Sequence, residues 1–136
     1  MTSKLSIQET LMSTYAARVR GDLDGTLAAF TDDTIFEFNG RGTGVQSLSE
    51  PVHGKAALRP VMRELIENYR FGDWRVISLI VDGEQALLHW RALVTVTANG
   101  KAAEFDVLDE MKFRDGKIAT FHQSTDTAAI MAMIAS

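Results

Sequence analysis

The segment Gly21–Thr34 constrains the fold more than any other part of the chain. Gly21 suits the left-handed residue that follows a helix, and Asp22 can cap a second, short helix that carries Phe30 inward. A pair of aspartates then leads into residues 34–38, where two phenylalanines fall on one face of an alternating segment, as in a strand. The segment therefore predicts the end of one helix, a short second helix and the start of the first strand.

The N-terminal residues have helical periodicity. Over residues 4–20 an apolar stripe recurs at helical spacing, and Ser3 or Thr2 can cap its start. The stripe consists of Ile7, Leu11, Met12, Tyr15, Ala16 and Val19. We therefore expect an amphipathic helix that packs this stripe against the rest of the protein.

Two more helices are expected further along the chain. Residues 39–54 contain four glycines and are typical of a long loop, which in compact domains is often functional. A short turn over 55–59 should follow, with the main helix beginning at Pro60, because proline lacks the N–H that a helix interior needs. Asp126 can cap a short final helix.

Four long segments rich in β-branched and aromatic residues occupy most of the second half of the chain. They are Trp74–Val81, Gln85–Ala98, Lys101–Arg114 and Lys117–Thr125. Asp-Gly or Asn-Gly separates each from the next, and such dipeptides between alternating segments are strong hairpin signals. The pattern predicts an antiparallel meander within one α+β domain covering 1–136, with the sheet curling around the first helix and leaving a cavity.

Composition excludes several classes of function. The chain has 136 residues, 46% of them hydrophobic, and a net charge of -4 without a basic cluster, which argues against nucleic-acid or membrane partners. There is no cysteine, and the three histidines are too far apart for a metal site, so we expect no metal and no cofactor. The polar N-terminus and the absence of a long apolar segment lead us to expect a soluble, cytoplasmic protein.

At this point the chain resembles a known family. The order of elements, the Gly21–Asp24 and Phe30–Asp33 segments, His53-Gly54 before the third helix and Asp115–Ile118 before the last strand are similar to the SnoaL-like, ketosteroid-isomerase-like branch of the nuclear transport factor 2 superfamily. The resemblance covers nearly the whole chain. It implies a cone-shaped curved antiparallel sheet wrapped around three N-terminal helices, with a short C-terminal helix and a homodimer formed through the sheet face.

The family's catalytic residues carry over unevenly. The resemblance places Phe38 where ketosteroid isomerases have their aspartate base, and Gln123 where other members have a catalytic aspartate. Thr14 matches the oxyanion tyrosine of the isomerases, with Tyr15 next to it, and Asp109 matches their second oxyanion donor. Both known base positions are therefore replaced, and steroid isomerisation by the family mechanism is not expected.

Asp109 is the first candidate catalytic residue. Alternation puts it on one face of a strand with Phe105, Val107 and Met111, where desolvation would raise the pKa of its carboxyl group. A protonated aspartic acid in such a site is known from ketosteroid isomerase, the standard example of this effect. The alternative is a partly exposed strand aspartate paired with an arginine or lysine.

Tyr15 and Gln123 are the other two candidate catalytic residues. The phenol of Tyr15 can bond a ligand or Asp109, or it can be a core tyrosine with a backbone partner. The amide of Gln123 can orient a carbonyl group or a water, but it cannot act as a base at neutral pH, and it can equally be bound to backbone.

The remaining candidates would bind an apolar ligand. They are Phe36, Phe38, Trp90, Met111 and Phe121. Such side chains with few polar groups are typical of a site for a small, mostly apolar molecule with a carbonyl or hydroxyl group, although they could also fill the cone completely. Proton transfer or water addition is the expected chemistry. A non-catalytic ligand-binding or dimerisation module is the alternative.

A dimer is expected through the second strand of the meander. One face of Gln85–Ala98 carries Trp90 and other core residues, whereas the opposite face mixes Leu87 and Leu93 with His89 and Arg91. That face is too mixed for a second core and too apolar for full solvation. A twofold partner would bury the leucines, with His89 and Arg91 bonding across the axis.

Overall fold

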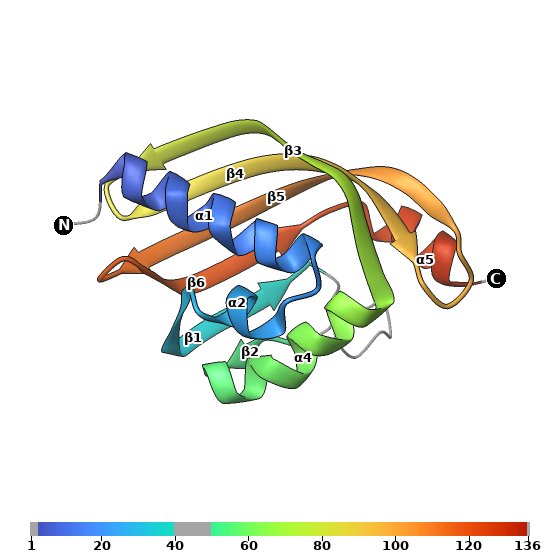
Figure 1. The fold of residues 1–136 in the computed structure, drawn as a ribbon, viewed down its shortest axis with the longest axis horizontal. Coiled ribbons are helices and arrows are strands. Elements are labelled where there is room, and N and C mark those ends of the chain that lie inside the picture. Colours follow the sequence, from blue (N-terminus) through green and yellow to red (C-terminus); the bar gives the residue numbers. More distant parts are fainter. Residues whose placement is uncertain (1–2, 40–49, 136) are drawn as a thin grey trace.

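The computed structural model describes residues 3–39 and 50–135. Helices α1 and α2 come first, α4 precedes the long strands, and α5 ends the described chain (Figure 1). Their bounds are Lys4–Val19, Leu23–Leu27, Lys55–Asn68 and Thr127–Ile134. The glycine-rich part of the expected long loop, residues 40–49, lies outside the described residues.

The structure confirms the three expected N-terminal helix caps and the expected glycine after the first helix. The side chain of Ser3 accepts from the backbone N–H of Ser6 at the start of α1. Asp22 and Asp126 accept in the same way from residues three positions later, at the starts of α2 and α5. Gly21 has φ +79°, the left-handed conformation in which glycine avoids the steric cost of a Cβ.

Six strands form one sheet in the order β2-β1-β6-β5-β4-β3. Their bounds are β1 Phe30–Phe38, β2 Val52–His53, β3 Tyr69–Asp82, β4 Gln85–Val96, β5 Ala102–Arg114 and β6 Lys117–Ser124. In Figure 1 the long strands curve together, and α1 runs along one face of the sheet. This confirms the expected α+β fold with a curved sheet.

One strand pair is not antiparallel. β1 pairs in parallel with β6, and Phe36 lies opposite Phe121. The hairpin dipeptides predicted only the pairing of β3 to β6 with one another, so they gave no information about where the first strand joins. The parallel pair brings the beginning and the end of the chain into one sheet.

Two strands begin earlier than the sequence indicated. Phe30 was expected on the second helix, but it opens β1, is 1% exposed and lies opposite Ile118 of β6. β3 begins at Tyr69 and not at Trp74, because the strand continues through a bulge at Gly72-Asp73. The register with β4 shifts there, and Asp73 has φ 49°.

Two expectations between β1 and the end of α4 were wrong. Val52–His53 forms a short strand against β1 inside the expected loop. α4 begins at Lys55 and contains Pro60. The buried side chains of Leu58 and Met62 lie on either side of the proline, and their packing in the core compensates for the hydrogen bond that the proline removes.

The buried face of α1 also differs from the expected stripe. Ile7, Leu11 and Tyr15 are buried as expected, but Met12 and Val19 are 45% and 43% exposed. In their place the structure buries other α1 residues, namely Thr14, Ala17 and Arg18. The inner face of α1 is therefore more polar than the sequence pattern suggested.

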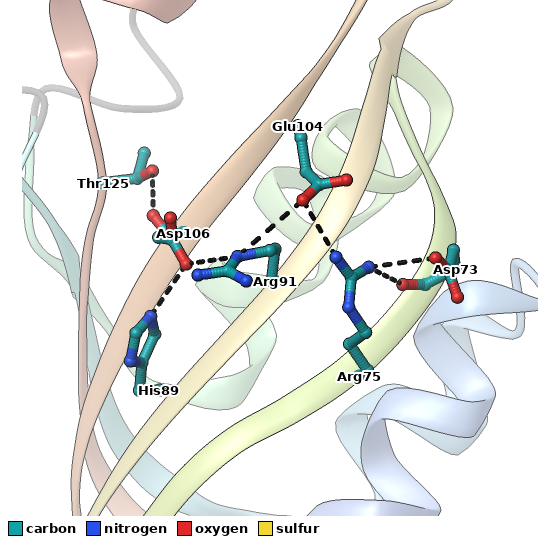
Figure 2. A network of polar contacts seen from close by, with 7 residues as sticks. All are labelled: Asp73, Arg75, His89, Arg91, Glu104, Asp106 and Thr125. Carbon is teal, nitrogen blue, oxygen red and sulfur yellow. Dashed lines mark hydrogen bonds and ion pairs between the residues drawn. The ribbon is translucent and has the colours of Figure 1, made fainter.

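The outer face of the sheet combines a polar network with exposed apolar side chains. Figure 2 shows the network over β3, β4 and β5, in which Asp106 accepts from Arg91 at 2.8 Å and contacts the His89 ring at 2.9 Å. His89 and Arg91 thus find polar partners in their own chain, where the sequence interpretation had placed these partners across a twofold axis. Exposed apolar residues of the same face are Ile35, Ile80, Leu93 and Leu108.

Candidate functional site

A cluster of four polar side chains lies between α1 and the inner face of the sheet. Tyr15 of α1 donates its hydroxyl proton to Oδ2 of Asp109 on β5. The indole Nε1 of Trp90 on β4 donates to the same Oδ2 at 2.8 Å, and to the Tyr15 oxygen at 3.0 Å. Gln123 of β6 donates from Nε2 to Oδ1 of Asp109 at 2.9 Å. Both carboxylate oxygens of Asp109 therefore accept hydrogen bonds.

Strand register explains why these residues meet. Asp109 and Gln123 are direct partners in the β5–β6 pair. Leu88 is the partner of Asp109 on β4, so Trp90 lies diagonally across from Asp109 on the same face. Side chains two apart on a strand share a face, and the buried face of α1 brings Tyr15 over all three. Three adjacent strands and one helix therefore build the cluster.

Burial dominates the protonation of the cluster. Asp109 is fully buried, and desolvation raises the pKa of its carboxyl group to about 6, although the hydrogen bonds from Tyr15, Gln123 and Trp90 oppose the rise. Burial also raises the pKa of the Tyr15 phenol well above its usual value, and the charge of Asp109 adds to this effect. The phenol therefore remains a proton donor at neutral pH, next to a carboxyl group that titrates close to neutrality. Asp109 bonds neutral donors, not the arginine or lysine of the alternative interpretation.

A cavity of about 80 Å³ adjoins the cluster. Most of the candidate residues from the sequence line this cavity, namely Tyr15, Phe36, Phe38, Trp90, Phe121 and Gln123. Asp109 and Met111 are buried and are not among the side chains around this cavity. Tyr15, Trp90 and Gln123 thus contribute to the cavity wall, whereas Asp109, which their polar groups bond, does not.

Several residues near the cavity were not identified from the sequence. Trp74 stacks on the Tyr15 ring at a centroid distance of 4.7 Å. Arg18 also lines the cavity, and its guanidinium group lies over the Phe71 ring. The signal for Arg18 was its position three residues after Tyr15, on the same helix face. A helix stripe defined by apolar side chains does not include a charged residue, so it did not identify Arg18.

The described part of the chain contains no cluster of side chains suited to bind a metal ion. Residues 3–39 and 50–135 contain no group of three or more histidine, aspartate or glutamate side chains placed to hold a metal ion. Across the same residues, no helix has the length and apolar character needed to cross a bilayer. His53 lies in β2 opposite Ile35, away from the Asp109 cluster.

Comparison with known proteins gives a family match and a consistent fold. A family model described as a SnoaL-like domain matches residues 13–121. Among curated proteins, none matches the chain significantly. A nuclear-transport-factor-2-like protein of unknown function from Burkholderia pseudomallei is 25% identical, with a TM-score of 0.84 over 96% of this chain and 98% of that chain.

Two further solved structures have the same fold at lower identity. A candidate isomerase from Bacillus subtilis is 14% identical, with a TM-score of 0.88 over 99% of this chain and 96% of that chain. TerC, co-crystallised with polyporic acid, is 21% identical, with a TM-score of 0.83 over 96% of this chain and 99% of that chain.

Proposed function

The chain belongs to the SnoaL-like family, and on that premise we propose that it binds a small, mostly apolar molecule with a carbonyl or hydroxyl oxygen. The observation that carries the proposal is a cavity lined mostly by apolar side chains whose wall also includes Tyr15 and Gln123. An oxygen on the ligand would bond these groups, and the ligand's apolar body would contact phenylalanines such as Phe36 and Phe121.

The size of the cavity favours a small ligand. Its volume of about 80 Å³ is below the ~300–1,000 Å³ of pockets for drug-sized molecules. A single ring with short substituents is the appropriate scale. Among neighbours of the same fold, TerC was co-crystallised with polyporic acid, which supports a small molecule as the type of ligand.

If catalysis occurs, we propose proton transfer or water addition at the ligand oxygen. When Asp109 is protonated, its carboxylic O–H can donate to the Tyr15 oxygen, which frees the Tyr15 hydroxyl to donate to the ligand oxygen. Asp109 would then act from behind as a positioning residue that holds Tyr15 and Gln123. One observation favours binding without catalysis. In the described part of the chain, no carboxylate or imidazole group lies among the side chains around the cavity, so no ordinary base contacts the ligand there.

A matched pair of probes tests the binding proposal. Cyclohexanone and methylenecyclohexane have nearly the same shape, but only the ketone has an oxygen. We expect calorimetry to show tighter binding of the ketone, by roughly tenfold for one hydrogen bond from a buried donor. The Tyr15→Phe variant should lose most of this preference. Equal binding of both probes to the wild-type protein would exclude the proposed role of the polar wall.

The same ketone separates catalysis from binding alone. Enolisation exchanges the hydrogens next to the carbonyl with deuterium from the solvent. Proton nuclear magnetic resonance in D₂O would then follow the exchange with and without the protein. Protein-dependent exchange that Tyr15→Phe abolishes supports proton transfer, whereas saturable binding with no added exchange supports the non-catalytic alternative.

We also propose a homodimer that covers the outer face of the sheet. The exposed side chains of Ile80, Leu93 and Leu108 lie on that face, which also carries the polar network of Figure 2. A second copy related by a twofold axis would bury these side chains against an equivalent surface.

A further inference from the structure

Arg18 is a buried cation at the end of α1. It is 7% exposed, and its Nη2 atom donates to the backbone oxygens of Leu65 at 3.0 Å and Tyr69 at 2.8 Å. Its guanidinium carbon lies 3.9 Å from the centre of the Phe71 ring. The same side chain lines the cavity beside Tyr15.

The groups around this cation are all neutral. Two carbonyl oxygens and an aromatic ring contact the guanidinium group, and the described residues place no aspartate or glutamate within ion-pair distance of it. Asp109, the buried carboxyl group of the cluster, bonds Tyr15, Trp90 and Gln123 instead. A buried charge without a counter-charge carries a large desolvation cost, which an anion in the cavity would offset.

A purely structural role accounts for only part of this arrangement. The two carbonyl groups belong to the last turn of α4 and the residue after it, where a basic side chain is favourable. Both bonds use one nitrogen, although a guanidinium group has five N–H donors on three nitrogens. No acceptor for the other two nitrogens is present among the described residues.

We propose that the ligand is an anion, and that Arg18 binds its charged oxygen while Tyr15 binds its carbonyl or hydroxyl oxygen. This inference rests on the proposed function and specifies the class of ligand: a small ring compound with a carboxylate or a similarly acidic oxygen. Tyr15 and Arg18 are three residues apart on one helix face, so their backbone positions differ by ~4.5 Å along the axis. Both residues also line the same cavity, so one small molecule in it can contact both.

Protonation is consistent with this role. Burial lowers the pKa of the Arg18 guanidinium group to about 10, and the phenol of Tyr15 acts in the opposite direction. Arg18 therefore remains charged at neutral pH, in a position where water competes weakly for an incoming anion. Charge-assisted bonds to carboxylates are among the stronger hydrogen bonds in proteins.

Three related probes test the inference on the wild-type protein by calorimetry at neutral pH. They are cyclohexanone, cyclohexanone with a carboxylate on the ring carbon opposite the carbonyl, and the primary carboxamide of that acid. The last two have the same shape and differ in charge. We expect the carboxylate to bind at least about tenfold more tightly than the carboxamide.

Substitutions test whether Arg18 causes the preference for the carboxylate over the carboxamide. Arg18→Gln should abolish it, and Arg18→Lys should keep part of it because the positive charge remains. Arg20→Gln makes the same chemical change on an exposed side chain two residues later, and it should keep the full preference. Since Arg18→Gln removes contacts to α4 and could fail to fold, the Nε–H resonance of Arg18 in the wild-type protein provides a second measurement. It should shift with the carboxylate and not with the carboxamide.

The outcomes separate this inference from the proposed function. Equal binding of carboxylate and carboxamide would overturn the anion inference, and bound cyclohexanone would leave the proposed function in place. A preference that survives in Arg18→Gln, or an unshifted Nε–H resonance, would also overturn the anion inference. If none of the three probes binds, both proposals fail.

Discussion

At the scale of single residues, the properties of the cluster depend on one buried carboxyl group. Asp109 has no exposed surface, and burial raises the pKa of its carboxyl group from its usual 3.8 to about 6. At neutral pH it is mainly a carboxylate that accepts hydrogen bonds from three side chains. Because the charged form is disfavoured by burial, the protein loses stability when this group ionises.

The first prediction concerns the pH dependence of stability. The folded state binds the Asp109 proton more tightly than the unfolded state. Its contribution is therefore fully present below the unfolded pKa and is lost as the pH rises through about 6. The free energy of unfolding falls by roughly 3 kcal/mol in total, because each unit of pKa shift corresponds to about 1.4 kcal/mol. Asp109→Asn should remove this dependence and be at least as stable as the wild type at neutral pH, as urea unfolding at several pH values would show. An unchanged pH dependence in the variant would contradict the assignment to Asp109.

The second prediction tests the bond from Tyr15. This hydrogen bond opposes the effect of burial on Asp109, so its removal in Tyr15→Phe should raise the pKa of the carboxyl group further. Carbon-13 resonances of the side-chain carboxyl group report this titration directly. A lower pKa in the variant would mean that Tyr15 does not donate to Asp109.

At the scale of secondary-structure elements, α4 contains an unfavourable residue. Pro60 is exposed on the helix surface, so its replacement removes little packing. Pro60→Ala restores an N–H within the helix, and this gain is partly offset by the greater freedom of the unfolded chain. We expect a stabilisation of about 1 kcal/mol or more, measured as a higher urea midpoint with an unchanged slope. Arg63→Ala, at another exposed position of α4, should change the midpoint little.

Much of the strand arrangement could be predicted because its signals are local. The dipeptides Asp82-Gly83 and Asp115-Gly116 mark two of the hairpins, and alternation placed Trp90 and Asp109 on the inner face. The bulge at Gly72-Asp73 was missed because glycine and aspartate are also common at strand ends. Pro60 was misjudged because packing between α4 and the core outweighs local helix preference.

The site itself could be predicted only in part. Inner-face alternation and the resemblance together brought Tyr15, Asp109 and Gln123 to attention, but they did not distinguish the cavity wall from the layer behind it. That distinction depends on how deeply α1 packs on the sheet, which no local pattern records. Helix spacing placed Arg18 on the same face as Tyr15, but its burial results from the contact between α1 and α4, which the spacing does not show.

At the scale of the whole molecule, the exposed apolar residues of the sheet predict a dimer. Leu93 is 43% exposed on the outer face, so a glutamate there would place charge in the proposed interface. Leu93→Glu should therefore dissociate the dimer, as sedimentation equilibrium at micromolar concentration would show. Leu5→Glu makes the same change on α1, where Leu5 is 65% exposed, and it should leave the dimer intact. A wild-type monomer at that concentration would refute the proposal.

The parallel pairing of β1 with β6 has a consequence for protein synthesis. Tyr15 and Gln123 are separated by 108 positions in the chain. At ~5–20 residues per second, a ribosome makes the later residue roughly five to twenty seconds after the earlier one. During that interval the inner faces of α1 and β1 have no β6 to pack against. Their apolar side chains are therefore exposed in the nascent chain, where they could cause aggregation. The polar cluster therefore forms only when translation has passed β6, and a chain released before that point has no site.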